Sequence, residues 1–275
     1  MTWMPGGHND WFSVMVGETD FHLKINHRAS TLYQNFDDAA GKAASLLYKQ
    51  WGHRPLYLAL SGGLDSELTA RILLNNQIPF TPVILKITDL NALETWYAEY
   101  WCSKNNIVPV ILKYSLDELA QEMVRLAPKL VQIKNYYQTP VLLIYEYAQK
   151  NNGSCIYSGG DINLDLDRKE FYCCSLDFIS NLVDPGQHPT SFFMYTPEIA
   201  LSYINQFDIA HDEQYNKLTF YQLLPRPKID YIQGMINTKT LQDVVDRIFY
   251  VFKLTKFNEK HWYGTKEQLV QNLQP

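Results

Sequence analysis

The chain has 275 residues, of which 46% are hydrophobic and 19% are charged, and its formal net charge is −5 at pH 7. A chain of this length and composition forms a folded globular protein with a substantial core. The negative charge argues against a broad basic surface for tRNA or DNA. We therefore expect a small-molecule substrate, and a nucleic acid partner is not favoured.

The sequence also bears on the location of the protein. No segment holds the ~20 uninterrupted apolar residues that a membrane-spanning helix needs, and residues 1–7 lack the charged head and apolar stretch of a signal peptide. The four cysteines show no C-x-x-C spacing, so neither a disulfide framework nor a zinc site is indicated. We expect a cytoplasmic protein without a membrane partner, and the sequence does not indicate its oligomeric state.

Residues 1–52 are predicted to form a small N-terminal hairpin followed by a helix. The segment 11–25 alternates loosely between apolar and polar residues on both sides of Gly17 and Glu18, as two antiparallel strands do. From 35 to 51, apolar side chains recur at the spacing of one helix face. This helix is expected to lead into the core.

Residues 53–170 alternate between short apolar segments and helical segments. The predicted strands cover 56–60, 82–87, 108–113 and 154–158, and the first two predicted helices cover 64–75 and 91–105. A third helix is predicted to have Thr139 as its N-cap and Pro140 as its first helical residue. Continuous apolar strands separated by amphipathic helices indicate a parallel sheet with helices on both faces. We predict an α/β fold with a five-stranded, Rossmann-like parallel sheet.

Two expectations concern the remaining helices. On helix 91–105 the apolar residues are expected to form one stripe that faces the core; they are Leu93, Trp96, Tyr97, Tyr100 and Trp101. Residues 171–275 contain several segments punctuated by proline, together with helical stretches such as 240–254. They are predicted to form a smaller, mainly helical C-terminal region.

The junction between strand 56–60 and helix 64–75 carries the clearest chemical signal. Its sequence is Leu60-Ser61-Gly62-Gly63-Leu64-Asp65-Ser66. Two glycines allow the backbone to approach a ligand closely, and the unpaired N–H groups of the first helical turn attract an anion. The two serine hydroxyls add further donors. A carboxylate would repel phosphate, so Asp65 fits this place best if Mg²⁺ bridges it to the anion.

This segment resembles the signature of the PP-loop, or N-type ATP pyrophosphatase, superfamily. Within it, the chain is most similar to the synthetase domain of asparagine synthetases and β-lactam synthetases. In those enzymes a helix that begins with proline precedes a strand ending in Ser-Gly-x-Gly-x-Asp-Glu-Leu, whose acidic residue holds Mg²⁺. Here Pro140 begins such a helix, and Ser158-Gly159-Gly160-Asp161 follows the later strand. The resemblance covers about residues 55–170 and implies an adenine nucleotide alpha hydrolase-like fold.

The resemblance implies that ATP is split into AMP and pyrophosphate. A carboxylate or amide oxygen of the substrate attacks the α-phosphate, and an amine or ammonia then displaces AMP from the adenylate. Asp65 and Asp161 are the expected catalytic residues and ligands of Mg²⁺. The second loop lacks the Asp-Glu pair of the family, so Asp165 is the next candidate ligand and Asp167 the third. An acidic surface turn is the alternative for this loop.

Nucleotide binding is expected at the carboxyl ends of the strands, with the adenine against the backbone of strand 82–87. The candidate residues are Leu60, Ser61, Gly62, Gly63, Leu64, Asp65, Ser66, Ile84, Leu85, Lys86, Gly159 and Gly160. A cationic side chain is also expected to stabilise the departing pyrophosphate. The candidates for that role are Arg71, Lys86, Lys253 and Lys256.

Other functions stay open at this stage. The main alternative is a PP-loop enzyme that modifies tRNA or a deazapurine, such as a tRNA lysidine synthetase, a tRNA thiolase or a deazapurine nitrile synthase. The thiolases and nitrile synthases commonly carry clustered cysteines, which this chain lacks apart from the adjacent Cys173 and Cys174. An ammonia-dependent NAD synthetase has a similar length and the same first motif, but no match in the second loop. We do not expect a glutaminase domain like that of asparagine synthetases, since Thr2 stands where its cysteine nucleophile would be. The sequence identifies neither the acceptor substrate nor the nucleophile.

Overall fold

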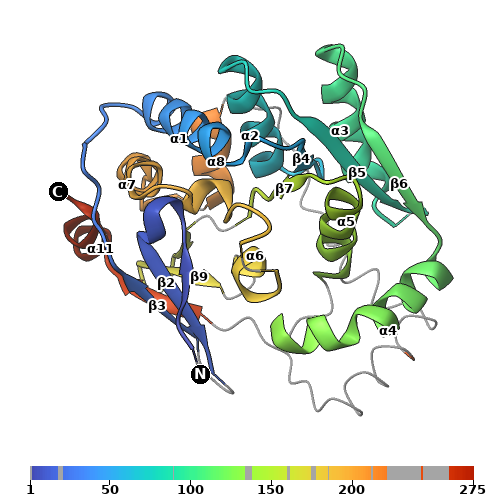
Figure 1. Ribbon diagram of the computed structural model, residues 1–275. Coiled ribbons are helices and arrows are strands. Elements are labelled where there is room, and N and C mark those ends of the chain that lie inside the picture. Colours follow the sequence, from blue (N-terminus) through green and yellow to red (C-terminus); the bar gives the residue numbers. More distant parts are fainter. Residues whose placement is uncertain are drawn as a thin grey trace.

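A computed structural model describes residues 2–17, 21–88, 90–133, 138–159, 162–174, 178–184, 186–211, 213–221, 243 and 260–275. Within these residues an α/β unit lies beside two small antiparallel sheets and several C-terminal helices (Figure 1). No helix in these ranges has an apolar stretch long enough to cross a membrane.

The central sheet contains four parallel strands in the described part of the chain. Their spatial order is β6 (Val110–Tyr114), β5 (Thr81–Ile87), β4 (Leu56–Ala59) and β7 (Ser154–Ile156). The four strands predicted from the sequence are therefore confirmed, whereas a fifth strand is not found among the described residues. The chain builds the sheet outward from β4 to β6 and then crosses back to β7. Between β4 and β7 lies the position where strand order reverses, at which open α/β sheets bind ligands.

Helices cover both faces of this sheet. α2 (Leu64–Asn75) and α3 (Ala92–Lys104) share one apolar cluster with inward residues of β4 and β5, and α1 (Phe36–Trp51) packs beside α2. α4 (Leu116–Ile133) and α5 (Thr139–Lys150) share a second cluster with the opposite side of the same strands. Leu58 and Ile84 belong to the first cluster and Val83 and Leu85 to the second, as the alternation of side chains along strands requires.

The N-terminal sheet has one strand more than expected. β2 (Phe12–Val16) and β3 (Phe21–Ile25) form the predicted hairpin, and β1 (Met4–Gly6) pairs antiparallel with β2 at its edge. Pro5 and Gly6 argue against a strand in the sequence, but an edge strand tolerates proline because one side needs no ladder hydrogen bonds.

The C-terminal region combines helices with a second antiparallel sheet. Its helices are α6 (Ile179–Leu182), α7 (Pro197–Gln206), α8 (Glu213–Tyr221) and α11 (Lys266–Leu273). The sheet contains β8 (Asn163–Asp165), β9 (Glu170–Cys174) and β10 (Lys260–Gly264). The predicted helix over 240–254 lies outside the described residues except for position 243.

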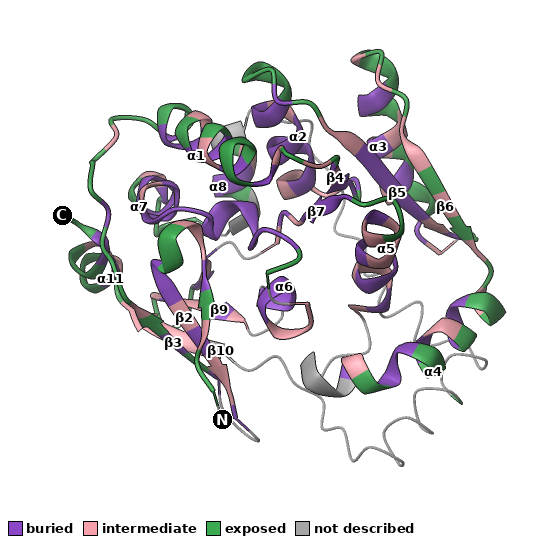
Figure 2. Ribbon diagram, viewed as in Figure 1, coloured by how far each residue is buried: buried purple, intermediate pink, exposed green. Residues whose placement is uncertain are grey.

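These regions pack against one another. One apolar cluster extends from Trp11 in the N-terminal region to Leu273 in α11, and α7 is buried on nearly every side (Figure 2). The three regions predicted from the sequence, with boundaries at residues 52 and 170, therefore contribute to one apolar core. Their division into separate domains stays a prediction.

Two helix expectations need correction, and one helix was missed. The predicted stripe of α3 is largely exposed at Leu93, Trp96 and Tyr100, whereas Thr95, Ala98, Trp101 and Cys102 are buried. α5 begins with Thr139 itself, so Gln138 is its N-cap. The missed helix is α4, whose capping box, in which Ser115 and Glu118 bond to each other's backbone N–H, is a recognisable start signal.

Candidate functional site

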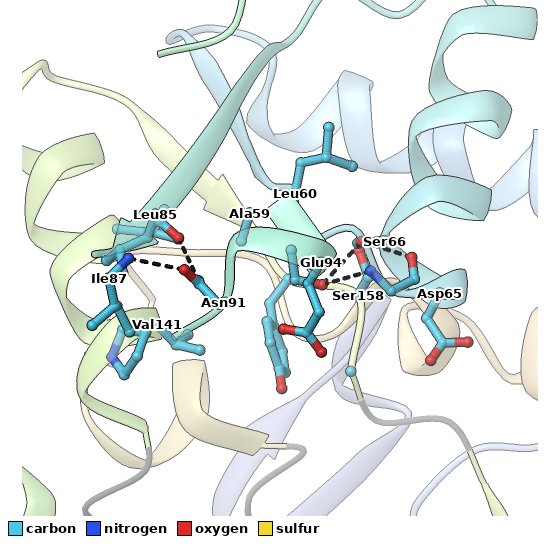
Figure 3. A pocket seen from close by; sticks show the side chains of 16 residues that line it. Ala59, Leu60, Asp65, Ser66, Leu85, Ile87, Asn91, Glu94, Val141 and Ser158 are labelled. Atoms are coloured by element: carbon cyan, nitrogen blue, oxygen red, sulfur yellow. Dashed lines mark hydrogen bonds between the residues drawn. The ribbon is translucent and has the colours of Figure 1, made fainter. Parts of the chain in front are cut away.

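A pocket of about 190 Å³ opens at the carboxyl ends of β4, β5 and β7 (Figure 3). It is lined by Ala59, Leu60, Ser61, Gly63, Asp65, Ser66, Leu85, Ile87, Asn91, Glu94, Pro140, Val141, Ile144, Tyr157, Ser158 and Gly159. Because β4 and β7 are neighbours, with Leu56 paired to Ser154 and Leu58 to Ile156, the loops that follow them reach the same pocket. The structure thus brings together the two Ser-Gly segments singled out in the sequence.

The loop between β4 and α2 is shaped by Gly62. This residue has a φ of 95°, in the left-handed region that favours glycine. A Cβ atom at Gly62 would lie 1.9 Å from the backbone carbonyl oxygen of Glu94 in α3. Gly63 differs, because its φ is −69° and it serves as the N-cap of α2. Gly62 is therefore the glycine that backbone conformation and space both require.

The two serine hydroxyls of the loop hold its curled form. The N–H of Gly63 donates to Oγ of Ser61 at 3.1 Å, and Oγ of Ser66 donates to the carbonyl of Gly63 at 3.0 Å. The two hydroxyl oxygens lie 3.2 Å apart, so Ser61 donates to Ser66 when Ser66 donates to Gly63. Both hydroxyls face the pocket at the N-terminus of α2, where they can be redirected to an anion.

Asp65 pairs with a cation that the sequence analysis missed. Its Oδ2 lies 3.1 Å from Nζ of Lys217 in α8, and the side chains of Asp65 and Lys217 are 26% and 9% exposed. Asn216 anchors this part of α8, because its side chain accepts from the N–H of Asp208 and donates to the carbonyls of Asp208 and His211. Lys217 lies 152 positions from Asp65 in the sequence, so no local pattern predicts their contact.

The cations expected from the sequence have other partners. Arg71 pairs with Glu67 one turn away in α2 at 2.7 Å, and Lys86 pairs with Glu99 in α3. Lys253 and Lys256 lie outside the described residues. Within the part of the chain that the structure describes, Lys217 is thus the lysine that contacts the motif directly.

The residues expected to contact a base divide according to strand alternation. Leu85 lines the pocket together with Ile87, the last residue of the strand segment expected to contact the base. Ile84 belongs to the apolar cluster on the other face, and Lys86 also points away, toward α3. Leu64 packs against the cluster beneath α2 rather than lining the pocket. Side chains at neighbouring positions of a strand point to opposite faces, so the expected contact of the base with the strand backbone stays a prediction.

The second loop contributes Ser158 and Gly159. Ser158 is buried, and its Oγ has no hydrogen-bond partner among the described residues, although it lies at the pocket. Gly160 and Asp161 lie outside the described residues. Asp165 stands at the end of β8, where its Oδ1 accepts from the N–H of Arg168 at 3.0 Å and closes the turn to β9. It does not line the pocket, and Asp167 lies in the same turn.

Further lining residues had no signal in the sequence. Glu94 adds a second carboxylate beside the loop, while Val141 and Ile144 of α5 add apolar surface. The pocket therefore joins a helix N-terminus rich in hydroxyl groups to an apolar wall. Such a combination suits a molecule with an anionic end and a flat apolar end.

The chemistry of the donors also suits Mg²⁺. Asp65 and the hydroxyls of Ser61, Ser66 and Ser158 offer the oxygen ligands that this ion prefers. The described residues contain no group of three or more His, Cys, Asp or Glu side chains that could hold a metal alone. Mg²⁺ commonly binds through one or two carboxylates together with phosphates and water, and the residues present fit that mode.

Comparisons with known proteins give weak similarities. No protein-family model matches the sequence, and no curated protein matches it. Among solved structures, an NH₃-dependent NAD synthetase from Campylobacter jejuni in complex with nitrate is 14% identical with a TM-score of 0.41. An NMN synthetase from Francisella tularensis is 12% identical with a TM-score of 0.39. Each alignment covers 82% of this chain and 98% of the other. At these scores neither match establishes a shared fold or activity, and the similarity to asparagine synthetases stays a prediction.

Proposed function

We propose that this protein is an ATP-dependent synthetase of the PP-loop type, which adenylates a carboxylate or amide oxygen of a small molecule. The observation that carries the proposal is the meeting of two Ser-Gly loops, from the adjacent parallel strands β4 and β7, in one pocket at the strand-order reversal. A single glycine-rich turn is common, but two such loops with a carboxylate and a buried lysine fit a polyphosphate.

In this proposal the phosphates lie over residues 61–66, at the N-terminus of α2. The loop N–H groups and the hydroxyls of Ser61 and Ser66 donate to phosphate oxygens, and Ser158 donates from the facing loop. The adenine lies against the edge of β5 beside Leu85 and Ile87, with Val141 of α5 as apolar contact. The apolar and anionic parts of ATP thus match the two parts of the pocket.

A carboxylate substrate reacts through a mixed anhydride with AMP, and an amide substrate reacts through an O-adenylated imidate. An oxygen of the substrate attacks the α-phosphorus, an O–P bond forms, and the bond from that phosphorus to the oxygen bridging the α and β phosphates breaks. Pyrophosphate leaves with the bridging oxygen. An amine or ammonia then attacks the activated carbon, and AMP departs with the transferred oxygen. The protein contributes mainly alignment and charge stabilisation.

Individual residues have distinct parts in this scheme. Lys217 exchanges its contact with Asp65 for one with the departing pyrophosphate, whose charge it stabilises. Asp65 and Asp161 would hold Mg²⁺, which neutralises phosphate charge when bound. Gly62 keeps the loop close to α3, so the N–H groups stay aimed at the phosphates.

The test is a pyrophosphate-release assay with ATP and Mg²⁺ across a panel of carboxylates, amines and tRNA, with the nucleotide product identified by chromatography. We expect AMP and pyrophosphate in equal amounts with one small-molecule acceptor class. Asp65→Asn should abolish most of this release, whereas Asp37→Asn, on the exposed first turn of α1, should retain it. ADP and orthophosphate as sole products would refute the proposal, and release only with tRNA would assign the substrate to RNA.

A further inference from the structure

The side chain of Asn91 occupies the edge of β5 inside the pocket. Its Oδ1 accepts from the N–H of Ile87 at 2.9 Å, and its Nδ2 donates to the carbonyl of Leu85 at 2.8 Å (Figure 3). Asn91 is 8% exposed. It stands at the N-cap of α3, yet its side chain makes no capping hydrogen bond. The carboxamide of Asn91 therefore bonds to β5 instead of to the first turn of α3.

The backbone groups that Asn91 binds are available because β4 ends early. The last hydrogen bond between β4 and β5 runs from the N–H of Leu60 to the carbonyl of Val83, at 3.0 Å. Beyond it, the chain turns into the loop at Ser61. Groups on one edge of a parallel strand recur every second residue, so the next pair facing β4 is the carbonyl of Leu85 and the N–H of Ile87. Asn91 replaces the missing peptide group of β4.

We propose that Asn91 is an exchangeable partner of this edge and that it sets the affinity of the pocket for a nucleobase. A base that presents a hydrogen-bond donor beside an acceptor, as the 6-amino group and N1 of adenine do, matches the same carbonyl of Leu85 and N–H of Ile87. Base and carboxamide cannot occupy these groups together, so binding requires the side chain of Asn91 to leave. This inference rests on the proposed function.

Two observations favour exchange over a fixed structural role. The pocket measures about 190 Å³, below the ~300–1,000 Å³ of typical ligand sites, and Asn91 forms part of its wall, so moving this side chain enlarges the space. An asparagine at an N-cap also has a second favourable position, in which its Oδ1 accepts from an N–H of the first helical turn. The released side chain therefore gains a hydrogen bond as it loses two.

The experiment compares the binding of ATP with that of inorganic tripolyphosphate, which reaches the loop but carries no base. Calorimetry is performed on the wild type, Asn91→Ala and Asn151→Ala. Asn151 is a matched control because its Nδ2 also donates to a backbone carbonyl, that of Tyr147, at the exposed end of α5. We expect Asn91→Ala to bind ATP about five-fold more tightly, the equivalent of one net hydrogen bond, with tripolyphosphate binding unchanged. Asn151→Ala should resemble the wild type for both ligands.

A second variant keeps the test decisive if Asn91→Ala does not fold. Asn91→Ser retains a residue that caps helices well but is too short to bridge both backbone groups, so it should show the same selective gain for ATP. ATP binding that is unchanged or weaker in the folded Asn91 variant, while the wild type binds ATP, overturns this inference alone. A wild type that binds neither ATP nor tripolyphosphate overturns the proposed function as well.

Discussion

Lys217 of α8 and Asp65 in the first turn of α2 form an ion pair with 3.1 Å between Nζ and Oδ2. The pair joins the C-terminal region to the end of the sheet at which we propose that the anion binds. Because the lysine side chain is only 9% exposed, water screens this pair less than an ion pair on the surface. In the proposed reaction the lysine must exchange the carboxylate for phosphate, so the same contact links stability to ligand binding.

Lys217→Met tests both consequences. The variant keeps an unbranched side chain but leaves Asp65 without this cation, and we expect the free energy of unfolding to fall by roughly 1–3 kcal/mol, less than for a fully buried pair. Pyrophosphate release should fall about 100-fold, as when a charge-stabilising group is removed. Urea unfolding measures the change in stability, and the release assay measures the change in activity. Lys49→Met, at an exposed position of α1, is the control for both. Full activity in a folded Lys217→Met would remove the lysine from the mechanism.

Gly62→Ala should displace the loop from α3. The substitution combines a left-handed φ of 95° with a Cβ that would meet the carbonyl oxygen of Glu94 at 1.9 Å. We expect a loss of roughly 2–5 kcal/mol of stability, the sum of backbone strain and overpacking, together with weaker binding of tripolyphosphate.

Gly186→Ala separates these two causes. Gly186 has a φ of 76°, and none of the described residues places an atom within 4 Å of an added Cβ, so backbone strain is the expected cost. Its cost should be roughly 1–2 kcal/mol, with no effect on tripolyphosphate binding. Equal losses of stability in the two variants would mean that the approach of Glu94 does not constrain the loop.

The sequence was most informative where local pattern and tertiary structure agree. The apolar runs that became β4 and β7 were predicted because strands buried on both faces leave continuous hydrophobic segments. Their adjacency, with Leu56 opposite Ser154, was a condition of the proposed site and is confirmed by the sheet register. The helix expected over 35–51 is α1, which begins at Phe36, and the side chain of Asn35 caps it by accepting from the N–H of Asp38.

Other features depended on contacts that no local pattern encodes. Trp96 lies on the exposed side of α3 although its size and spacing suggested burial, whereas Trp101 of the same helix is buried. Lys217 reaches Asp65 from a distant helix. The role of Asn91 follows from where β4 stops pairing, which depends on the turn at Ser61 rather than on the residues around position 91.

His188 should make stability depend on pH. His188 covers the edge of β7. Its Nδ1 accepts from the N–H of Cys155 at 2.9 Å, and its ring stacks on Tyr145. Burial, with smaller contributions from the positive charges of Arg54 and Lys129, lowers the pKa of His188 from 6.5 to about 4. Between these values the unfolded chain binds a proton that the folded protein does not. Stability from this residue is therefore complete above pH 6.5 and declines as the pH falls toward 4, by about 3 kcal/mol in total.

Urea midpoints at pH 7.0, 5.5 and 4.5 measure this effect. His188→Asn is the control, because its Oδ1 stands where Nδ1 of histidine accepts from Cys155 but does not titrate. The wild type should lose more stability than the variant between pH 7.0 and 4.5. Parallel curves for the two proteins would show that His188 does not contribute to the acid sensitivity.

The last prediction separates Asp161 from Asp165 as the second carboxylate of the site. Asp161 follows Ser158 and Gly159, which line the pocket, whereas the carboxylate of Asp165 accepts from the N–H of Arg168 in the β8–β9 turn. Asp165→Asn retains an oxygen for that hydrogen bond, so both stability and pyrophosphate release should stay at the wild-type level.

Asp161→Asn should lower pyrophosphate release about 100-fold, as loss of a charge-stabilising group does, because the charge that would hold Mg²⁺ is removed without a change in volume. A Mg²⁺ titration distinguishes this loss from a misfolded loop, since weakened ion binding is partly restored at higher Mg²⁺ whereas a distorted pocket is not. If Asp165→Asn loses activity and Asp161→Asn does not, the alignment of the second loop is wrong. If both variants are fully active, the loop is an acidic turn, and Asp65 supplies the protein carboxylate without either of them.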